Sequence, residues 1–258
     1  MSNKKHEHSS KHDWTSEYNH PDCTKYYQNV MDKMQLVERC EIVAKYSEKH
    51  LVPLFKQWSG DLDKPLQFLD LLCCYGNDTL AYINAYFQTD YAKTWASQET
   101  CFQISKPRQF PVETLGIDIS APALQFGKKV GIFDRTKVLD LNKLSETETQ
   151  FLEEKCQSSN VLIINSLAYI NEDQIRLIID WFASGKEPGM IAIGFVYSYM
   201  GPELISRYKF HLLKKLKFFA SVPMMNRYLQ EAERMKFGHE FGTYSRAYYE
   251  VWYLTREK

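Results

Sequence analysis

The sequence predicts an α/β protein with a doubly wound, mostly parallel seven-stranded sheet. From residue 66 onward, short apolar segments alternate with longer segments of helical periodicity, which is the pattern of successive strand–helix units. The last two apolar segments, residues 237–243 and 248–255, are joined by a turn too short for a parallel crossover. We therefore expect the last strand to run antiparallel.

Helical periodicity begins before the first strand. In residues 22–58, apolar side chains recur at spacings of three and four, which predicts two or three consecutive helices that end at residues 58–61 (Trp-Ser-Gly-Asp). The strands predicted after this point are residues 66–72, 112–119, 136–140, 160–165, 190–197, 237–243 and 248–255, and the helices are residues 77–87, 121–130, 146–155, 172–183, 202–216 and 224–235.

Composition limits the classes of function. The chain has 258 residues, with 32 Lys and Arg against 32 Asp and Glu, and it is 44% hydrophobic, which is ordinary for a globular protein. Because binding to nucleic acid requires a surplus of basic residues to neutralise phosphates, this balance argues against a nucleic-acid partner. Aromatic residues make up 14%, with 17 tyrosines, and tyrosine suits the wall of a small-molecule pocket.

We divide the chain into three parts. Residues 1–13 have almost no apolar side chains and predict a disordered tail, residues 14–60 predict a helical lid, and residues 61–258 predict the α/β domain. Within that domain, residues 88–111 exceed the usual connection of about two to six residues and form either a functional loop or an inert helical insertion. No segment resembles a signal peptide or a bilayer span, which predicts a cytoplasmic protein without membrane contact.

Polar residues follow the first four predicted strands. In an open α/β sheet, ligands bind at the carboxyl ends of the strands, near the point where the strand order reverses. Asp118 ends the second strand, where a carboxylate can accept both hydroxyl protons of a ribose, and Ser120 with Pro122 then begins a helix. The alternative is that Asp118 only caps that helix.

The third strand is followed by a pair that suits an adenine ring. Asp140 and the backbone amide of Leu141 can contact the edge of the ring, while Ile119 covers one of its faces. As with Asp118, the carboxylate of Asp140 can instead serve as a helix cap. Asp70 and Asn165 stand toward the carboxyl ends of the first and fourth strands and complete the polar edge.

In this arrangement, residues 61–258 resemble the class I S-adenosylmethionine-dependent methyltransferases. Residues 70–76 (Asp-Leu-Leu-Cys-Cys-Tyr-Gly) lie where that family has its D/E-x-G-x-G-x-G loop, residues 116–120 are similar to its G-x-D-x-S motif, and Asp140-Leu141 to its adenine-binding motif. The antiparallel last strand is also typical of this Rossmann-like methyltransferase fold. More narrowly, the first motif resembles an LDLCC-x-YG type found in bacterial enzymes acting on small molecules.

The resemblance implies a cofactor site and an acceptor site. The cofactor, S-adenosylmethionine with S-adenosylhomocysteine as its product, would contact residues of the strand ends and the lid, namely Asp70, Leu72, Cys73, Gly76, Asn77, Asp118, Ile119, Asp140, Leu141, Asn165 and Tyr27. The catalytic candidates are Tyr169, Tyr197 and Arg227, and further candidates for the acceptor pocket are Tyr26, Tyr199 and Tyr228. Arg227 would clamp a substrate carboxylate.

Two departures from the family pattern stand in the first motif. Leu72 and Cys74 replace two of its three glycines, and only Gly76 is retained. This leaves open a weaker cofactor site, a shifted loop or a protein that has lost catalysis. Cys73 and Cys74 have neither a neighbouring CxxC partner nor a histidine at zinc-ligand spacing, so we interpret them as small buried residues and predict no metal site.

The function predicted from the sequence is methyl transfer to a small molecule by in-line displacement. The alternatives are a catalytically silent binding module of the same fold and a dehydrogenase with a degenerate nucleotide motif, although the antiparallel last strand argues against a dehydrogenase. We expect a monomer or a homodimer. The basic segment 209–217 is predicted to be a helix that faces solvent, with contact to an acidic surface or a membrane as the alternative.

Overall fold

The computed structural model describes most of the chain. The described residues are 15–32, 36–84, 98–105, 107–165, 167–196, 201–223 and 244–256. The predicted tail (1–13), the helix predicted over 224–235 and the strand predicted over 237–243 lie outside them. In the described part of the chain, no helix has the length and apolar character that crossing a membrane requires.

A seven-stranded sheet forms the centre of the molecule, with the strand order β3-β2-β1-β4-β5-β7-β6. The first five strands in sequence are parallel to one another, and β7 is antiparallel to both β5 and β6. The predicted fold class is therefore confirmed. The strands are β1 (Leu66–Leu71), β2 (Val112–Asp118), β3 (Arg135–Val138), β4 (Val161–Ile164), β5 (Gly189–Val196), β6 (His211–Pro223) and β7 (Tyr244–Arg256).

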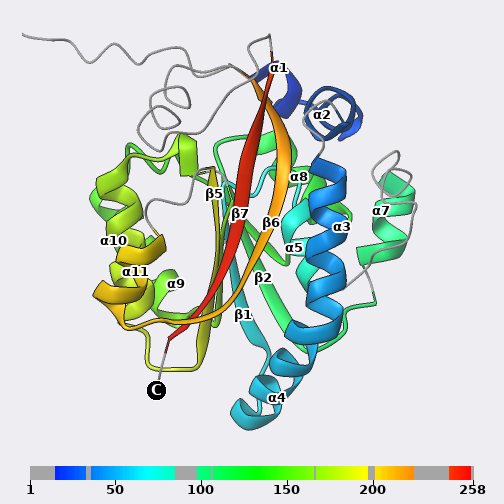
Figure 1. Ribbon diagram of the computed structural model, residues 1–258. Coiled ribbons are helices and arrows are strands. Elements are labelled where there is room, and N and C mark those ends of the chain that lie inside the picture. The colour runs from blue at the N-terminus through cyan, green and yellow to red at the C-terminus, as the bar shows by residue number, and fades with distance from the viewer. Residues whose placement is uncertain are drawn as a thin grey trace, which may run out of the picture.

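Helices cover both faces of this sheet, as Figure 1 shows. One face packs on α9 (Glu146–Ser158), α10 (Glu172–Ala183) and α11 (Gly201–Tyr208), and the other on α3, α5 and α8. The elements on that second side are α1 (Thr15–Tyr18), α2 (Thr24–Tyr26), η1 (Tyr27–Asp32), α3 (Leu36–Tyr46), η2 (Ser47–Leu51), α4 (Val52–Leu62), α5 (Asn77–Ile83), α7 (Gln98–Ser105) and α8 (Ala121–Lys129). A short turn, η3 (Leu167–Tyr169), follows β4.

Local sequence signals explain where several helices begin. The Ser145 side chain and Glu148 form a reciprocal capping box at the start of α9. Ser120 caps α8 as predicted, since its Oγ accepts a hydrogen bond from the Ala123 amide at 3.3 Å. Together these caps fix helix starts close behind the ends of β2 and β3.

Two predicted elements are wrong. Gly60 does not end the first helical region, because α4 continues to Leu62 and stops where Asp63 turns left-handed. The helix predicted over 202–216 ends at Tyr208, since Lys209 has a φ of 54°, and residues 211–223 form strand β6. The leucines of this segment recur at a helical spacing, which explains the prediction. In the structure, Lys215 extends over β7, with its Nζ 3.5 Å from the centre of the Trp252 ring.

The predicted closing hairpin is therefore also corrected. Residues 248–255 do form part of an antiparallel strand, β7, but β7 is paired with β5 on one side and with β6 on the other. Both of its hydrogen-bonding edges are paired with described strands, and residues 237–243 lie outside the described residues. The partner comes from the segment that helical spacing had assigned to a helix.

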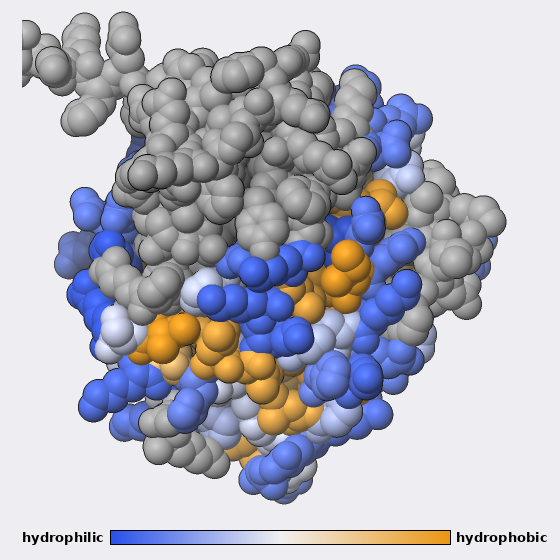
Figure 2. All heavy atoms as spheres, in the orientation of Figure 1, coloured by the Kyte–Doolittle hydropathy of each residue, from blue (hydrophilic) through white to orange (hydrophobic). Residues whose placement is uncertain are grey.

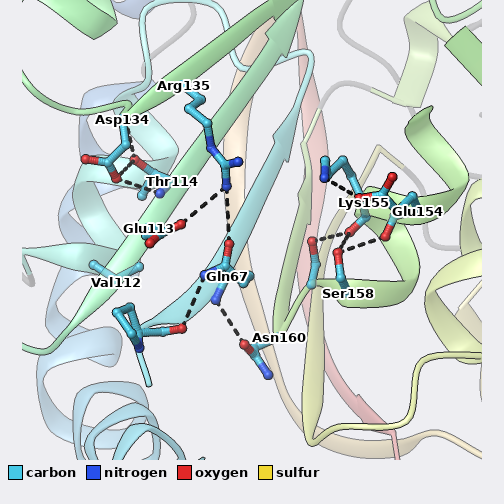
Figure 3. A network of polar contacts seen from close by, with 12 residues as sticks. Gln67, Val112, Glu113, Thr114, Asp134, Arg135, Glu154, Lys155, Ser158 and Asn160 are labelled. Atoms are coloured by element: carbon cyan, nitrogen blue, oxygen red, sulfur yellow. Dashed lines mark hydrogen bonds and ion pairs between the residues drawn. The ribbon is translucent and has the colours of Figure 1, made fainter. Parts of the chain in front are cut away.

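Polar contacts join the strands at the amino edge of the sheet (Figure 3). The Gln67 amide donates to Asn160 Oδ1 at 2.9 Å, which connects β1 to the start of β4. Arg135 of β3 donates to Gln67 Oε1 at 3.4 Å and to Glu113 Oε2 at 3.3 Å. Asp134 accepts from the Thr114 amide at 2.7 Å. Side chains thus pair polar groups across four neighbouring strands on this edge.

Candidate functional site

The loop after β1 has an unusual backbone. Leu72, Cys74 and Gly76 all have positive φ, at 57°, 50° and 90°. These are the three positions at which the resemblance places glycines. A residue with a Cβ costs about 1–2 kcal/mol in this left-handed region. The loop therefore keeps the left-handed backbone that glycines usually allow, although two of the three positions are not glycine. Backbone strain of this kind is concentrated at functional sites.

Packing explains why Gly76 is the glycine that remains. A Cβ on Gly76 would lie 2.8 Å from Ile132 Cγ2 and 2.9 Å from Phe133 Cζ. The same Phe133 ring closes against Gly116 of β2 and Gly127 of α8. At position 72, by contrast, the leucine packs against the core beside the sheet, and Cys74 is buried without such a collision.

Asp118 joins the loop to the end of β2. Its Oδ2 accepts the Cys74 amide at 2.9 Å and its Oδ1 accepts the Ser120 amide at 2.8 Å, and the residue is 6% exposed. Burial raises the pKa of the Asp118 carboxyl, although the amide hydrogen bonds oppose that shift. A carboxylate has about four acceptor positions, so two amide bonds leave room for a ligand hydroxyl.

Ile119, the next residue, is an apolar side chain that is largely exposed to solvent. Ile119 is 62% exposed, the most of any large hydrophobic residue described, and Val138 of β3 is 49% exposed. Val138 is the register partner of Asp118, so both apolar side chains lie at the carboxyl edge between β2 and β3. Farther along the chain, Leu141 is buried in the core, and Asp140 Oδ1 accepts the Asn142 amide at 3.0 Å.

Beneath the loop, Asp70 is buried and accepts a hydrogen bond from Thr79 Oγ1 at 2.6 Å. Burial raises the pKa of the Asp70 carboxyl well above its ordinary value, and the nearby carboxylates Asp78 and Asp118 raise it further. Thr79 and Asp78 both lie in the first turn of α5, which follows the loop directly. Three acidic side chains therefore lie close together beneath and beside the loop, at an energetic cost to their ionised forms.

The N-terminal helices contact the same loop. Tyr75 Oη lies 3.3, 3.2 and 3.0 Å from the carbonyl oxygens of Glu17, Tyr18 and His20 and donates into this group. Ser120 Oγ donates to the Tyr18 carbonyl at 2.6 Å. The segment around α1 is thus held on the loop after β1 and on the turn after β2.

Two more contacts come from farther along this segment. Tyr26 Oη donates to Asn77 Oδ1 at 3.2 Å, and its ring centre is 5.1 Å from that of Tyr75. Arg39 of α3 forms a largely buried ion pair with Asp78. Tyr26 and Arg39 thus both contact the first turn of α5.

The structure brings many of the residues predicted from the sequence together. Cys73, Cys74 and Tyr75 belong to one buried cluster, against which Tyr27 and Tyr169 pack from the lid and from the turn after β4. Asn142 Nδ2 donates to the Tyr169 carbonyl at 2.8 Å and so holds that turn to the loop after β3. Asn165 is buried at the end of β4. Tyr197, Tyr199, Arg227 and Tyr228 lie outside the described residues.

Three residues of this region were not identified from the sequence: Tyr75, Thr79 and Phe133. Tyr75 lies inside the first motif, but its partners are backbone carbonyls, which the sequence does not distinguish. Thr79 has the simplest signal, a hydroxyl nine residues after Asp70 in the first turn of a helix. The role of Phe133 depends on three glycines that are distant in sequence, which only the folded structure brings together.

Solved structures with a similar fold include methyltransferases. One is the N-methyltransferase NodS from Bradyrhizobium japonicum in complex with S-adenosyl-L-homocysteine, which is 10% identical in sequence. The alignment covers 88% of this chain and 99% of NodS, with a TM-score of 0.41. Magnesium protoporphyrin IX methyltransferase from Synechocystis with bound SAM is 14% identical, covers 89% and 85%, and has a TM-score of 0.44. No protein-family model and no curated protein matches the sequence. At this level of similarity, the comparisons carry no argument about function.

Proposed function

We propose that this protein is an S-adenosylmethionine-dependent methyltransferase that acts on a small molecule. One observation carries the proposal: Asp118 accepts the amide of Cys74, inside a loop that keeps a left-handed backbone at residues 72, 74 and 76. The loop lies at the switch point of the sheet, since β1 has β2 on one side and β4 on the other. Ligands of open α/β sheets bind at this place.

The residues present suit an adenosyl cofactor. Asp118 would accept the ribose hydroxyls, Ile119 would cover one face of the adenine, and Asp140 with the Leu141 amide would contact its edge. The exposure of Ile119 supports this assignment, since an apolar side chain that is 62% exposed gains from being covered. The remaining cofactor contacts would come from the loop, β4 and the lid, namely Asp70, Leu72, Cys73, Gly76, Asn77, Asn165 and Tyr27.

The cofactor supplies an activated methyl group on a sulfonium, so the protein has mainly to align an acceptor and exclude water. Tyr169 packs against the loop cluster, and we assign it to the border of the acceptor pocket. Tyr197 and Arg227 are the other residues we assign to that pocket. The balanced charge of the chain favours a small acceptor over a nucleic acid.

Residues 14–60 would act as the lid. Their contacts with Tyr75, Asn77, Asp78 and Ser120 are all made to the two segments that would hold the cofactor. Cofactor exchange would therefore require these contacts to open. Replacing Tyr75 by Phe removes the donor to the three carbonyls without changing the ring, and we expect faster dissociation of the cofactor by stopped-flow measurement.

Calorimetric titration with S-adenosylmethionine and S-adenosylhomocysteine tests the proposal, with NADH as a control for a dehydrogenase. We expect micromolar binding of both adenosyl compounds, no binding of NADH, and loss of binding in Asp118→Ala. Glu113→Ala, on the same strand but exposed at the amino edge, is the matched control and should bind like the wild type. Assay of small acceptors by mass spectrometry would then identify the methylated product.

The second candidate is a binding module without catalysis. The observation in its favour is the Leu72 side chain, which replaces a glycine where the methionine part of the cofactor would approach. A folded protein that binds neither adenosyl compound, and that gains binding in Leu72→Gly, would support this alternative.

A further inference from the structure

Two cysteines meet where the N-terminal segment packs against α7. Cys23 caps the start of α2, and Cys101 lies in α7, inside the stretch 88–111 that exceeds an ordinary connection. Their side chains are 1% and 0% exposed and belong to the same buried cluster, and the two thiols are hydrogen-bonded to each other. Contact of this kind is a requirement for a disulfide, whose sulfur atoms are about 2 Å apart.

The other cysteines are buried as well. On the face that Figure 2 shows, the described surface mixes strongly hydrophilic side chains with hydrophobic ones, but none of the six cysteines of the chain is exposed. Cys40 accepts a hydrogen bond from Asn77 Nδ2 at 3.5 Å, and Cys156 lies in α9 on the opposite face of the sheet. Buried thiols are protected from oxidants in solution, so a movement of the chain must expose them before they react.

The helix that carries Cys101 is fixed to the α/β domain. Ser105, at the end of α7, donates a hydrogen bond to the Val130 carbonyl directly after α8. Asn84, directly after α5, donates from its Nδ2 to the Ile104 carbonyl. These bonds tie the C-terminal end of α7 to two helices of the domain, so Cys101 has a fixed position relative to the sheet.

Cys23 instead lies on a segment that can separate from the domain. We call residues 15–26 the α1–α2 segment. Its helices have only four and three residues, and helices of this length are not stable alone. The segment therefore depends on its hydrogen bonds to Tyr75, Asn77 and Ser120, which can break locally without unfolding the domain. Cys23 and Cys101 thus lie on opposite sides of a joint that opens.

Two simpler roles for the pair make different predictions. In the described part of the chain, no group of three or more His, Cys, Asp and Glu side chains could hold a metal ion, so these two thiols are not part of a metal site there. Buried cysteines also serve as small apolar side chains. That role predicts no response to an oxidant, which an experiment can distinguish from a redox role.

We propose that Cys23 and Cys101 form a disulfide in the presence of hydrogen peroxide, and that this bond locks the α1–α2 segment onto the domain. A locked segment would also slow exchange of the adenosyl cofactor, a consequence that rests on the proposed function. The long stretch 88–111 then has a role, because its helix α7 supplies the fixed partner for the lid.

The order of the chemical steps follows from the contact between the thiols. The hydrogen bond to Cys23, together with burial, raises the pKa of the Cys101 thiol, so Cys23 is the sulfur that reacts first when opening exposes it. Its thiolate attacks one oxygen of the peroxide and the O–O bond breaks, which gives a sulfenic acid and a hydroxide that takes up the thiol proton. On closure the Cys101 thiol attacks the Cys23 sulfur, the S–O bond breaks, and a second water leaves. Two thiols are oxidised by two electrons, and one peroxide is reduced to two waters.

Peptide mapping by mass spectrometry tests the proposal on the full-length protein, after treatment with equimolar hydrogen peroxide and alkylation of the remaining thiols. We expect a disulfide between the peptides that contain Cys23 and Cys101, and its loss on treatment with dithiothreitol. Hydrogen exchange of the amides of residues 15–26, measured without cofactor, should slow about tenfold in the oxidised protein, because the disulfide opposes local opening.

Three variants sharpen the test. Cys23→Ala should form no such bond, and its hydrogen exchange should not respond to peroxide. Cys156→Ala is the matched control, since it removes an equally buried thiol from α9 and should leave oxidation of the pair unchanged. Tyr75→Phe removes a donor that holds the α1–α2 segment, so this variant should form the disulfide several-fold faster than the wild type.

Two results would overturn the proposal: a folded protein in which peroxide produces no disulfide between Cys23 and Cys101, or a disulfide that leaves hydrogen exchange of residues 15–26 unchanged. Stopped-flow dissociation of S-adenosylhomocysteine separates this proposal from the proposed function. Dissociation should be about tenfold slower after oxidation and should recover on reduction. A protein that forms the lock but binds no adenosyl compound would refute the proposed function and uphold the disulfide. Equally fast dissociation in both redox states would refute the lock and leave the cofactor site intact.

Discussion

The two edges of the central sheet differ in how their polar groups are treated. At the carboxyl edge, Leu72 and Cys74 adopt a left-handed backbone, and the carboxyls of Asp70 and Asp118 are buried with raised pKa values. At the amino edge, polar groups pair with one another across neighbouring strands, as Gln67 does with Asn160 and Thr114 with Asp134. Backbone strain and buried carboxyls thus lie at the carboxyl edge, where we propose the ligand site. The polar pairs of the amino edge stabilise the fold and offset this cost.

Arg256 shows how the amino edge is stabilised. It ends β7, is 8% exposed, and donates to the carbonyls of Glu187 at 2.6 Å and Ser159 at 2.9 Å, and also to that of Phe182. Its guanidinium fills the space beside Gly189, where a Cβ would lie 2.6 Å from the Arg256 Nε. A single side chain therefore connects β7 to the loops before β4 and β5.

The largest expected effect comes from removing this residue. Arg256→Ala leaves three carbonyls without their charged donor, and we expect a loss of about 3 kcal/mol or more in the free energy of unfolding by urea. Arg176→Ala breaks an i,i+4 surface pair with Glu172 and should cost only about 0.3–0.5 kcal/mol. Similar losses in the two variants would contradict the role assigned to Arg256.

Gly76→Ala tests whether the remaining glycine of the motif is required by packing. The new Cβ would meet Ile132 and Phe133 in a left-handed residue, so we expect a loss of about 2–3 kcal/mol. Gly60→Ala is the matched control, because nothing lies within 4 Å of its Cβ position inside α4, and it should stabilise by up to about 1 kcal/mol. Thermal unfolding measures both, and a stable Gly76→Ala would refute the packing argument.

The strain at position 74 can be measured against its neighbour. Cys73 and Cys74 are both buried, but only Cys74 has a positive φ. Cys74→Gly relieves left-handed strain, whereas Cys73→Gly only loses packing. We expect the Cys74 variant to be about 1–2 kcal/mol more stable than the Cys73 variant. Equal stabilities would mean that the loop is not strained at position 74.

The smallest effect concerns pH. Because the pKa of Asp70 is raised in the folded state, its ionisation costs stability as pH rises above the ordinary value of 3.8. Asp70→Asn keeps an acceptor for Thr79 and does not ionise. We expect the free energy of unfolding of the wild type to fall relative to that of Asp70→Asn as pH rises above 3.8, and the difference to level off once pH passes the raised pKa of the folded state. A pH-independent difference between the two proteins would contradict the raised pKa.

The sequence predicted the buried strands better than the exposed one. The apolar segments of β1, β2, β4 and β5 are recognisable because parallel strands covered on both faces read as continuous hydrophobic runs. Strand β6 has lysines at positions where a buried strand has apolar residues, and its leucines match a helical period. Only the pairing with β7 decides its conformation.

The candidate site was predictable in part. Asp70 and Asp118 follow from the rule that ligands bind at the carboxyl ends of strands, and Ser120 from the preferences of helix caps. The bond between Asp118 and the Cys74 amide was not predictable, since it joins residues 44 positions apart through a backbone group. The contacts between Tyr75 and residues 17–20 were not predictable either, because their acceptors are backbone carbonyls, which every residue has.

The most direct test of the central claim is calorimetric titration of Ile119→Asn with S-adenosylmethionine, together with its urea unfolding. Because Ile119 is 62% exposed, the substitution should leave stability unchanged. If Ile119 covers the adenine, losing that contact costs about 1.4 kcal/mol and weakens binding about tenfold. Leu177→Asn, an exposed leucine of α10, should bind like the wild type. Unchanged affinity in Ile119→Asn would contradict the proposed cofactor site.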